Sequence, residues 1–376
     1  MIYPHKQILI IGGGLAGLIA GIRMARQGVD CVLLEKREYP FHRVCGEYIS
    51  NEALPFLLRE KMYPENLALP SFSKFQLSAV NGKSQITDLD LGGFGISRYT
   101  LDHHLYQLGL QEGLTFQTGI AVDNLEFNEQ ENVFRVRAGA DLYSADWVIG
   151  AFGKRSALDK QLDRRFLKKR SPYVGVKYHI RYQHSENVIA LHNFNGGYCG
   201  ISNIEDGKTN LCYLVHRDQV KRFGNIRTME EKVLFQNPLL KEIFLNADFL
   251  FDKPETINEI SFATKEPVWN HLHMAGDAAG MIAPLCGNGM AMAIHTGKLV
   301  SDLLLETLEK KYPRKKAEEA YNKIWNQTFA GRLRTGRFIQ HYLFGSEASS
   351  QAAVALAIHF KPLTRMIISK THGKVF

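Results

Sequence analysis

A glycine-rich turn between two short apolar runs constrains the fold of this chain more than any other feature of its sequence. Residues 7–11 (QILII) have the composition of a strand and lead into the pattern G-x-G-x-x-G, formed by Gly12, Gly14 and Gly17. A stretch with helical spacing follows, and then a second apolar run at 29–34. This succession predicts the β-α-β unit of dinucleotide-binding sheets. A Rossmann-like domain is therefore expected.

The same residues predict how the unit holds a dinucleotide. Glycine permits the tight turn and lets the backbone approach a pyrophosphate, whose charge is met by the amides at a helix N-terminus. Glu35 ends the second apolar run, where a carboxylate accepts hydrogen bonds from ribose hydroxyls and selects a dinucleotide without a 2′-phosphate. The predicted cofactor contacts in this unit are Gly12, Gly14, Leu15, Ala16, Gly17, Glu35 and Lys36.

The length of the chain predicts more than one domain. With 376 residues it exceeds the roughly 250–300 residues that one hydrophobic core serves. The expected fold class is α/β: a discontinuous Rossmann-like domain, a second α+β domain built on a mostly antiparallel sheet, and C-terminal helices. The predicted division is 1–70, 98–170 and 270–312 for the cofactor domain, 71–97 and 171–269 for the substrate domain, and 313–376 for a helical region.

Composition excludes several classes of protein. Hydrophobic residues make up 45% of the chain and charged residues 22%, the balance of a globular protein. The formal net charge is +8, but the basic residues are spread out with no recognition motif, so no nucleic-acid partner is expected. Five cysteines without CxxC spacing predict neither a disulfide framework nor a metal site.

The expected location is the cytoplasm. Free cysteines suit a reducing compartment. The sequence shows no charged leader and no apolar stretch of about 20 residues, so neither a signal peptide nor a membrane-spanning helix is predicted. Peripheral contact with a membrane stays open.

A second glycine-rich segment, MAGDAAGMIAPLCGNGMAMAIHTGKLVSDLL, starts far downstream at Met274. With the first pattern, it resembles the FAD-dependent superfamily that contains p-hydroxybenzoate hydroxylase, other aromatic hydroxylases, geranylgeranyl reductases and flavin-dependent halogenases. The resemblance implies FAD, with the carboxylate of Asp277 on the ribityl chain and a helix N-terminus aimed at the flavin. The positive end of that helix stabilises an anionic reduced flavin. The contacts implied here are Gly276, Asp277, Gly287, Asn288, Gly289 and Met290.

Two further segments extend the resemblance. ISRYTLDHHLYQLGLQEG is similar to the family's Arg-x-x-Leu-Asp helix, which implies that Arg98 contacts the cofactor. FHRVCGEYIS resembles the Cys-Gly segment near the flavin of geranylgeranyl reductases, and Arg43, Cys45 and Gly46 are its implied contacts. Cys45 is the candidate catalytic residue, because a thiol beside a flavin relays protons or electrons, although a small cysteine also suits a tight loop. Cys286 lies in the other loop expected near the flavin, so these two thiols are candidates to approach each other.

One fingerprint of the family has changed. An Asp-Gly pair followed by Ser and Arg should fall in DWVIGAFGKRSALDK, but Phe152 replaces the aspartate and Asp159 the arginine, while Gly153 and Ser156 are kept. In hydroxylases that use NADPH this segment is associated with both FAD and the pyridine nucleotide. Direct reduction by NAD(P)H is therefore expected to be slow, and a separate electron-donor protein stays open as the reductant.

The predicted function is that of an FAD-dependent oxidoreductase, a reductase or a monooxygenase, acting on a hydrophobic small molecule. The Cys-Gly-Glu loop favours reduction of a C=C bond as in geranylgeranyl reductases. Aromatic hydroxylation is the alternative, and a non-catalytic flavin-binding module is a third interpretation. The halogenase motif Trp-x-Trp-x-Ile-Pro is absent, and of the prenyl reductase strand Tyr-x-Trp-x-Phe-Pro only Tyr198 is kept.

Other polar residues are given ordinary structural roles. His179, His192 and His216 fall in strand-like runs on the presumed substrate side, but a lone histidine without a partner is weak evidence of acid–base chemistry. The run RRFLKKR at 164–170 is interpreted as a solvated basic face.

Overall fold

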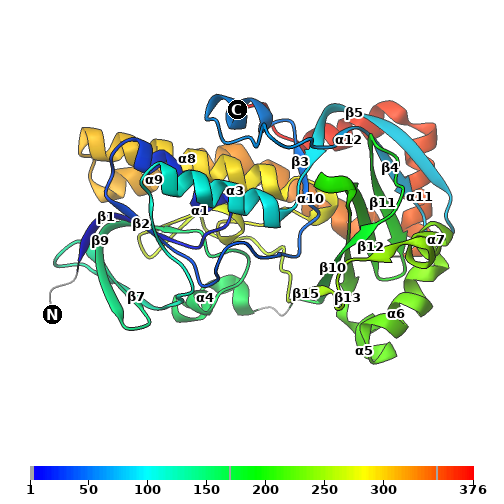
Figure 1. Ribbon diagram of the computed structural model, residues 1–376, viewed down its shortest axis with the longest axis horizontal. Coiled ribbons are helices and arrows are strands. Elements are labelled where there is room, and N and C mark those ends of the chain that lie inside the picture. The colour runs from blue at the N-terminus through cyan, green and yellow to red at the C-terminus, as the bar shows by residue number, and fades with distance from the viewer. Residues whose placement is uncertain (1–3, 169–170, 344–345) are drawn as a thin grey trace.

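The computed structural model describes residues 4–168, 171–343 and 346–376. Within these ranges the chain forms two sheets, one toward each end of the molecule, with long helices running along it (Figure 1). This arrangement confirms the mixed α/β class with two sheets and additional helices.

The first sheet is the predicted Rossmann-like sheet. Its strand order is β16-β17-β9-β1-β2-β6, and all pairs except β16 with β17 are parallel. Strand β2 and the last four residues of β1 are apolar and buried without alternation, because both of their faces are covered. The strands are β1 (His5–Ile11), β2 (Cys31–Leu34), β6 (Thr115–Gln117), β9 (Asp141–Gly150), β16 (Val268–Trp269) and β17 (Leu272–Met274).

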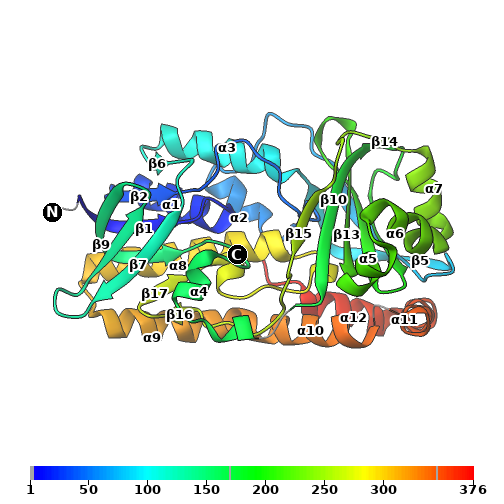
Figure 2. The same ribbon diagram turned by 90° about the horizontal axis from the view of Figure 1, so that it is seen from below.

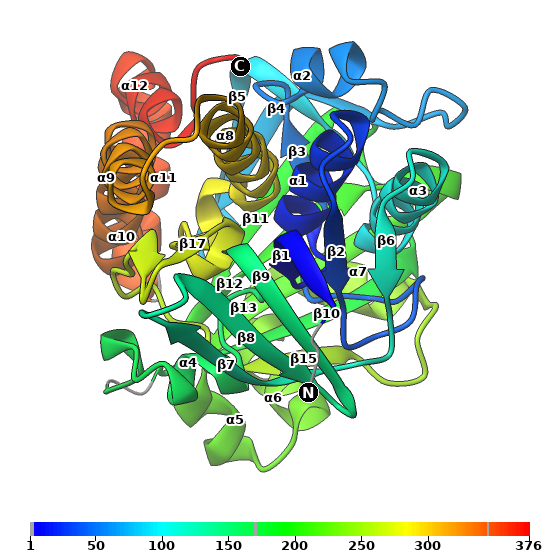
Figure 3. The ribbon, with the colours of Figure 1, turned by 90° about the vertical axis from the view of Figure 1, so that its left-hand side faces the viewer.

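Helices cover one face of this sheet and a small antiparallel ribbon extends it on the other side (Figure 3). The helices are α1 (Leu15–Arg26), α3 (Arg98–Gln111) and α8 (Gly289–Lys310). The ribbon consists of β7 (Val122–Asn128) and β8 (Val133–Ala138), which join the sheet through β9. The N-terminus of α1 directly follows the first glycine-rich segment of the sequence, and the N-terminus of α8 directly follows the second.

The second sheet is mostly antiparallel, in the order β14-β10-β13-β12-β11-β4-β5-β3, with β15 also paired to β10. Only β11 and β4 pair in parallel. The strands are β3 (Tyr48–Ser50), β4 (Ser71–Ser78), β5 (Ser84–Gly95), β10 (Tyr173–Arg181), β11 (Val188–Phe194), β12 (Gly197–Asn203), β13 (Thr209–His216), β14 (Asp248–Phe249) and β15 (Glu255–Asn258).

The two faces of this second sheet differ. Its outer face packs on α6 (Ile226–Val233) and α7 (Pro238–Asn246), with α5 (Arg217–Phe223) beside them (Figure 2). Its inner face packs on the loop that precedes α8, through Tyr198, Leu214 and Met281. The inner face is therefore turned toward the cofactor domain. Strand β3, which was assigned to the cofactor domain, pairs with β5 in the second sheet, and β16, which was assigned to the substrate domain, pairs with β17 in the first sheet. The exact domain boundaries therefore stay an interpretation.

The remaining helices brace the molecule. Helix α9 (Arg314–Trp325) is tied to the first sheet by the Tyr321 hydroxyl, which donates to the carbonyl of Met274 at 2.7 Å. Helices α10 (Gly331–Leu343), α11 (Glu347–His359) and α12 (Lys361–Thr371) follow, while α2 (Leu54–Arg59) and α4 (Ala157–Gln161) are short. In the described part of the chain, no single helix has the length and apolar character to cross a membrane, although α11 with Pro362–Thr371 meets those criteria as a bent pair.

The interpretation of 164–170 as a solvated basic face is wrong at Arg164. Its side chain is fully buried, and Nη1 lies 3.3 Å from the carboxylate of Asp159, which is also buried. A sequence pattern of basic residues does not show that one of them has a buried carboxylate as its partner. Residues 169–170 lie outside the described residues.

Candidate functional site

The first glycine-rich turn leaves no room for side chains. Gly12 has a φ of +108°, and a Cβ on it would lie 2.4 Å from the carbonyl oxygen of Ala151. A Cβ on Gly17 would lie 2.0 Å from the carbonyl oxygen of Gly12. Both glycines are thus needed for the turn that brings the N-terminus of α1 to the edge of the sheet.

Glu35 lies beside this turn, as its place after β2 predicted. Its Oε2 accepts a hydrogen bond from the backbone N–H of Gly13 at 2.8 Å and lies 3.3 Å from Nη2 of Arg43. The hydroxyl of Tyr39 donates to the carbonyl of Gly13 at 2.5 Å. A buried carboxylate is therefore held at the point where the ribose of a bound dinucleotide would follow its pyrophosphate.

Two arginines lie over the same turn, joined by one aspartate. Nε and Nη2 of Arg98 donate to the two carboxylate oxygens of Asp102, each at 2.7 Å, and Nε of Arg43 donates to Asp102 at 3.1 Å. Nη2 of Arg98 lies 3.6 Å from the position that a Cβ on Gly14 would take. A cation at the N-terminus of α1 suits the two negative charges of a pyrophosphate.

The second glycine-rich segment leads into α8. Gly276 has a φ of +60°, and its N–H donates to the hydroxyl of Thr296 at 2.8 Å. Asn288 precedes the helix, but its amide nitrogen donates to the carbonyl of Thr371 at 3.1 Å rather than capping α8. Its Oδ1 is buried and has no partner within the described ranges. The side chain of Asn288 therefore leaves the first amides of α8 without a cap, and these amides can bind a ligand.

Three loop glycines border open space. A Cβ placed on Gly46, Gly153 or Gly289 would meet no atom within 4 Å. These glycines belong to the Cys-Gly loop, the segment after β9 and the first turn of α8. Nζ of Lys265 donates to the carbonyl of Lys154 at 2.8 Å and to that of Asp277 at 2.7 Å, so the segment after β9 and the Asp277 loop meet. Gly287, before α8, lies against Tyr48, which follows the Cys-Gly loop.

The second fingerprint has a structural role despite its altered sequence. Asp159 accepts from the backbone N–H of Ser156 at 2.7 Å and thereby caps α4, and it pairs with Arg164. Arg164 donates to the carbonyl of Ala278 at 2.7 Å, and Lys265 donates to the carbonyl of Asp277, also at 2.7 Å. Arg164 thus pairs with the aspartate that stands in place of the family's arginine, and it holds the Asp277 loop through the carbonyl of Ala278.

The Cys-Gly loop is held by the second sheet. Asn210 of β13 donates to the carbonyl of Cys45 at 3.2 Å, Ser202 of β12 donates to that of Gly46 at 3.0 Å, and Lys177 of β10 donates to that of Arg43 at 3.2 Å. Burial raises the pKa of the Cys45 thiol, and the positive charge of Arg98 opposes that rise. The thiol is thus carried by a loop that both domains hold in place.

A buried ionic cluster adjoins the loop. Nζ of Lys177 lies 2.5 Å from one carboxylate oxygen of Glu47, and Nε2 of His179 lies 2.7 Å from the other. The side chains of Lys177 and Glu47 are fully buried. We did not predict this cluster from the sequence, although Lys177 and His179 alternate with apolar residues in YVGVKYHIR, a pattern that indicates a polar face on an otherwise buried strand.

Of the three strand histidines, only His179 contacts the cofactor domain. His192 bonds to the hydroxyl of Ser78 at 2.9 Å, and burial lowers its pKa to about 3. His216 caps α5. Their positions agree with the structural roles given to them, but His192 does not lie on the predicted substrate side, since it pairs with Cys199, which belongs to the outer-face core.

Some predicted contacts have side chains turned away from the turn. Leu15, Ala16 and Met290 are buried in the core, and Ala16 packs against Gly276. Lys36 is exposed. These four residues stay predicted cofactor contacts, which their main chains alone would make. The same holds for Gly287, which packs against Tyr48. Cys286 packs against Gly336 of α10, whereas Cys45 has Cys212 among its neighbours.

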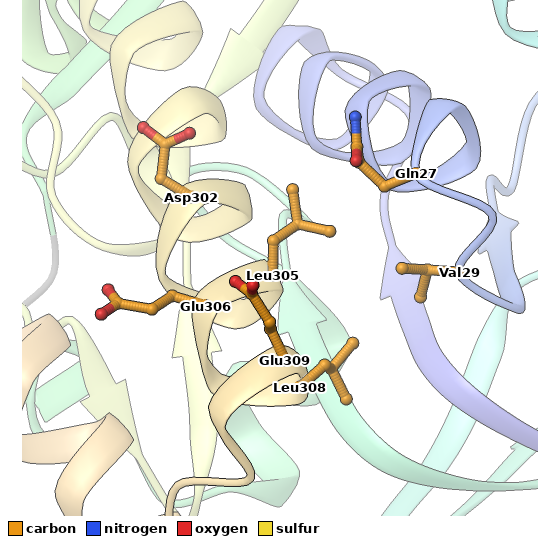
Figure 4. Close-up of a pocket in the computed structure, with 7 residues that line it drawn as sticks. All are labelled: Gln27, Val29, Asp302, Leu305, Glu306, Leu308 and Glu309. Carbon is orange, nitrogen blue, oxygen red and sulfur yellow. The ribbon is translucent and has the colours of Figure 1, made fainter.

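A groove elsewhere on the molecule does not suit the cofactor. Figure 4 shows it between the C-terminal halves of α1 and α8, where Gln27 and Val29 face Asp302, Glu306 and Glu309. The C-terminal end of a helix carries the negative end of its dipole, and three carboxylates add to that charge. This groove therefore suits a pyrophosphate less well than the glycine-rich N-termini of α1 and α8.

Sequence and structure comparisons agree with this site. A model of the FAD binding domain family matches residues 5–314. Digeranylgeranylglycerophospholipid reductase from Methanospirillum hungatei is 25% identical over 350 residues, which cover 86% of this chain and 82% of that protein. Conditioned medium factor receptor 1 from Dictyostelium discoideum is 22% identical over 379 residues, covering 93% of this chain and 73% of the receptor.

Solved structures share the fold at low sequence identity. A geranylgeranyl bacteriochlorophyll reductase-like protein from Thermoplasma acidophilum superposes with a TM-score of 0.79 at 18% identity, covering 98% of this chain and 96% of its own. Halogenase PltM, solved with phloroglucinol and FAD, gives a TM-score of 0.77 at 14% identity, covering 97% of this chain and 82% of its own.

Three features together define a dinucleotide-binding flavoprotein: a glycine-rich turn in a parallel sheet, an acidic residue after the second strand, and a second glycine-rich segment at the start of a helix. The chain belongs to the FAD binding domain family. It is an FAD-dependent oxidoreductase, as the sequence predicted. Its relatives include reductases, and a probable FAD-dependent monooxygenase from Pseudomonas aeruginosa shares the fold with a TM-score of 0.73 at 15% identity, covering 93% of this chain and 99% of its own.

Proposed function

We propose that this protein reduces a carbon–carbon double bond in a hydrophobic small molecule, with Cys45 as the proton donor. The observation that supports the proposal is the position of the Cys-Gly loop, whose Cys45 and Gly46 carbonyls accept hydrogen bonds from Asn210 and Ser202 of the second sheet. A group that protonates a substrate must reach both the substrate and the site of hydride delivery.

The residues of the site fit FAD. Arg98 and the amides of the first turn would hold the pyrophosphate, Glu35 the adenosine ribose and Asp277 the ribityl chain, while the amides at the start of α8 would face the flavin ring. When bound and reduced, FAD supplies a hydride to one carbon of the double bond. The Cys45 thiol gives its proton to the other carbon, so that one C=C bond becomes a saturated C–C bond.

The surroundings of Cys45 support this role. Arg98 and Lys177 both lower the pKa of the thiol and so stabilise the thiolate that remains after proton donation.

The experiment uses a digeranylgeranylglycerophospholipid in detergent micelles as the probe, because relatives of this chain are named as reductases of that lipid. FAD-loaded protein is reduced with dithionite under anaerobic conditions and mixed with the lipid, and the product is analysed by mass spectrometry. A reductase adds two hydrogen atoms for each double bond without oxygen. A product that gains an oxygen atom, from an aromatic probe and only in the presence of O₂, would instead support the hydroxylase alternative.

Substitution of Cys45 tests the role of the thiol. Cys45→Ser should lower turnover more than about tenfold with FAD binding retained, because a hydroxyl keeps the size of the thiol but not its acidity. Cys212→Ser is the matched control, since Cys212 lies near Cys45 on the inner face but outside the loop. A Cys45→Ser variant as active as the control would remove the thiol from the mechanism.

A further inference from the structure

Helix α12, near the end of the chain, exposes apolar side chains. The helix lies at the periphery of the molecule (Figures 1 and 3), where Leu363 is exposed and Met366 is 46% exposed. Phe360, at the turn before the helix, is 60% exposed. These residues follow one another at intervals of three, so their side chains lie on neighbouring turns of one side of the helix. Large apolar side chains that gather on one exposed side indicate a contact surface.

The same side of the helix carries positive charge. Lys370 lies on the next turn, and Lys374 follows in the tail; both are exposed. Neither lysine forms an ion pair within the described part of the chain, whereas Arg365 pairs with Asp88 of β5 at 3.2 Å. From residue 346 to residue 376 the sequence contains four Lys and Arg residues and one acidic residue. The apolar side chains are therefore flanked by uncompensated positive charge.

Helix α11 holds α12 at this place. Ala353 and Val354 of α11 are buried against the inner face of the second sheet, and α12 leaves α11 at a bend of 114°. The tail fixes the other end of α12, since the backbone N–H of Phe376 donates to the carbonyl of Glu52 at 3.3 Å and the ring of Phe376 stacks on His295. Because α11 is part of the core, α12 is placed to lie along a membrane surface rather than to cross the bilayer with α11.

The charge of this side decides which partner suits it. A second copy related by a two-fold axis through the exposed side of α12 would bring the lysines of both chains together, and like charges repel. An anionic lipid surface instead offers phosphate groups to the lysines and an acyl layer to the apolar side chains. Amphipathic helices that combine exposed apolar residues with lysines lie in the plane of such an interface.

We propose that the exposed side of α12 and the tail form a docking face for an anionic membrane surface, with the apolar side chains at the acyl boundary and the lysines on the headgroups. The docking face consists of Phe360, Leu363, Met366, Lys370 and Lys374. It adjoins the candidate cofactor site, because the carbonyl of Thr371, at the end of α12, accepts a hydrogen bond from the side chain of Asn288 directly before α8. Membrane binding requires no turnover, so its test is independent of the reaction proposed above.

The experiment measures sedimentation of the FAD-loaded protein with vesicles of phosphatidylcholine alone or of phosphatidylcholine mixed with phosphatidylglycerol. The parent should bind the mixed vesicles more tightly than the neutral ones, and salt should weaken this binding. Lys370→Gln/Lys374→Gln should weaken binding to the mixed vesicles by about tenfold or more, since each lysine near an anionic surface contributes about fivefold. Leu363→Ser/Met366→Ser should weaken it by about tenfold through lost apolar burial.

Matched controls come from the outer face of the second sheet. Lys221→Gln/Lys232→Gln removes the same charge from α5 and α6, where both lysines are exposed. Leu245→Ser removes an apolar side chain that is 64% exposed on α7. Each control should bind the mixed vesicles within about twofold of the parent, because these residues lie outside the docking face.

A labelled variant tests the contact without removing charge. Met366→Cys, labelled with a polarity-sensitive dye and verified by mass spectrometry, should show a blue shift of its emission with the mixed vesicles, whereas labelled Leu245→Cys should show none. Three results would overturn the proposal: equal binding of the parent to both kinds of vesicle or to neither, α12 variants that bind like their controls, or an unchanged emission of the Met366→Cys label. A dimer in light scattering that Leu363→Ser/Met366→Ser converts to a monomer would also overturn it, because a second copy would then cover this face.

Discussion

Replacement of Arg164 by Met removes a buried cation that holds the Asp277 loop. Arg164 donates to the carbonyl of Ala278 at 2.7 Å and to that of Glu266 at 3.0 Å, and it pairs with Asp159 at 3.3 Å. Breaking a buried ion pair from one side costs about 3–5 kcal/mol, because a charge is left without its partner. Lys265 also acts to lower the pKa of Asp159, so the expected loss is near the lower end, about 3 kcal/mol.

The pair itself contributes less than this loss. Burial raises the pKa of Asp159 and lowers that of Arg164, so both charges are penalised by the interior. The double variant Asp159→Asn/Arg164→Met, which removes both charges, should therefore recover at least half of the stability lost by Arg164→Met. Urea unfolding followed by circular dichroism measures the three free energies. A loss below about 1 kcal/mol for Arg164→Met, or a double variant less stable than Arg164→Met, would refute the reasoning.

Three further predictions concern the cofactor and the fold. Asp277→Ala should weaken FAD binding by about 1.5–3 kcal/mol, the value of a charge-assisted hydrogen bond, and an unchanged dissociation constant in equilibrium dialysis would contradict its ribityl contact. Burial lowers the pKa of His273 from 6.5 to about 3. As the pH falls between these two values, the unfolded chain binds more protons than the folded chain, so the free energy of unfolding should decrease. In urea unfolding, His273→Leu should make this decrease smaller. In anaerobic stopped-flow, NADPH alone should bleach the flavin slowly, because Phe152 and Asp159 replace the fingerprint residues. Fast stoichiometric bleaching would show that these two replacements do not affect reduction of the flavin.

The sequence predicted the parts of the site that depend on local pattern. Gly12 and Gly17 were recognisable because a tight turn between a strand and a helix tolerates no Cβ there, and the structure shows the close contacts that require glycine. The second glycine-rich segment predicted a long helix over 287–310, and α8 begins at Gly289. The mostly antiparallel second sheet followed from strand-like runs separated by turns.

The contacts between distant segments could not be read from the sequence. Arg164 was placed in a solvated run, because nothing near it in the sequence indicates that Asp159 and the carbonyl of Ala278 surround it. Lys177 lies far along the chain from its partner Glu47, and only the packing of the second sheet on the Cys-Gly loop joins them. Tertiary pairing of this kind depends on how the two domains meet, which no local pattern encodes.

The central claim, that the two glycine-rich segments bind FAD, is tested most directly by the flavin that the purified protein releases on denaturation. Chromatographic separation of the released flavin distinguishes FAD from FMN and gives the amount bound for each chain. The account predicts FAD at a ratio that approaches one for each chain after reconstitution, because Glu35 and Arg98 lie where the adenosine half of the dinucleotide would bind. Release of FMN alone, or no flavin after reconstitution, would contradict it.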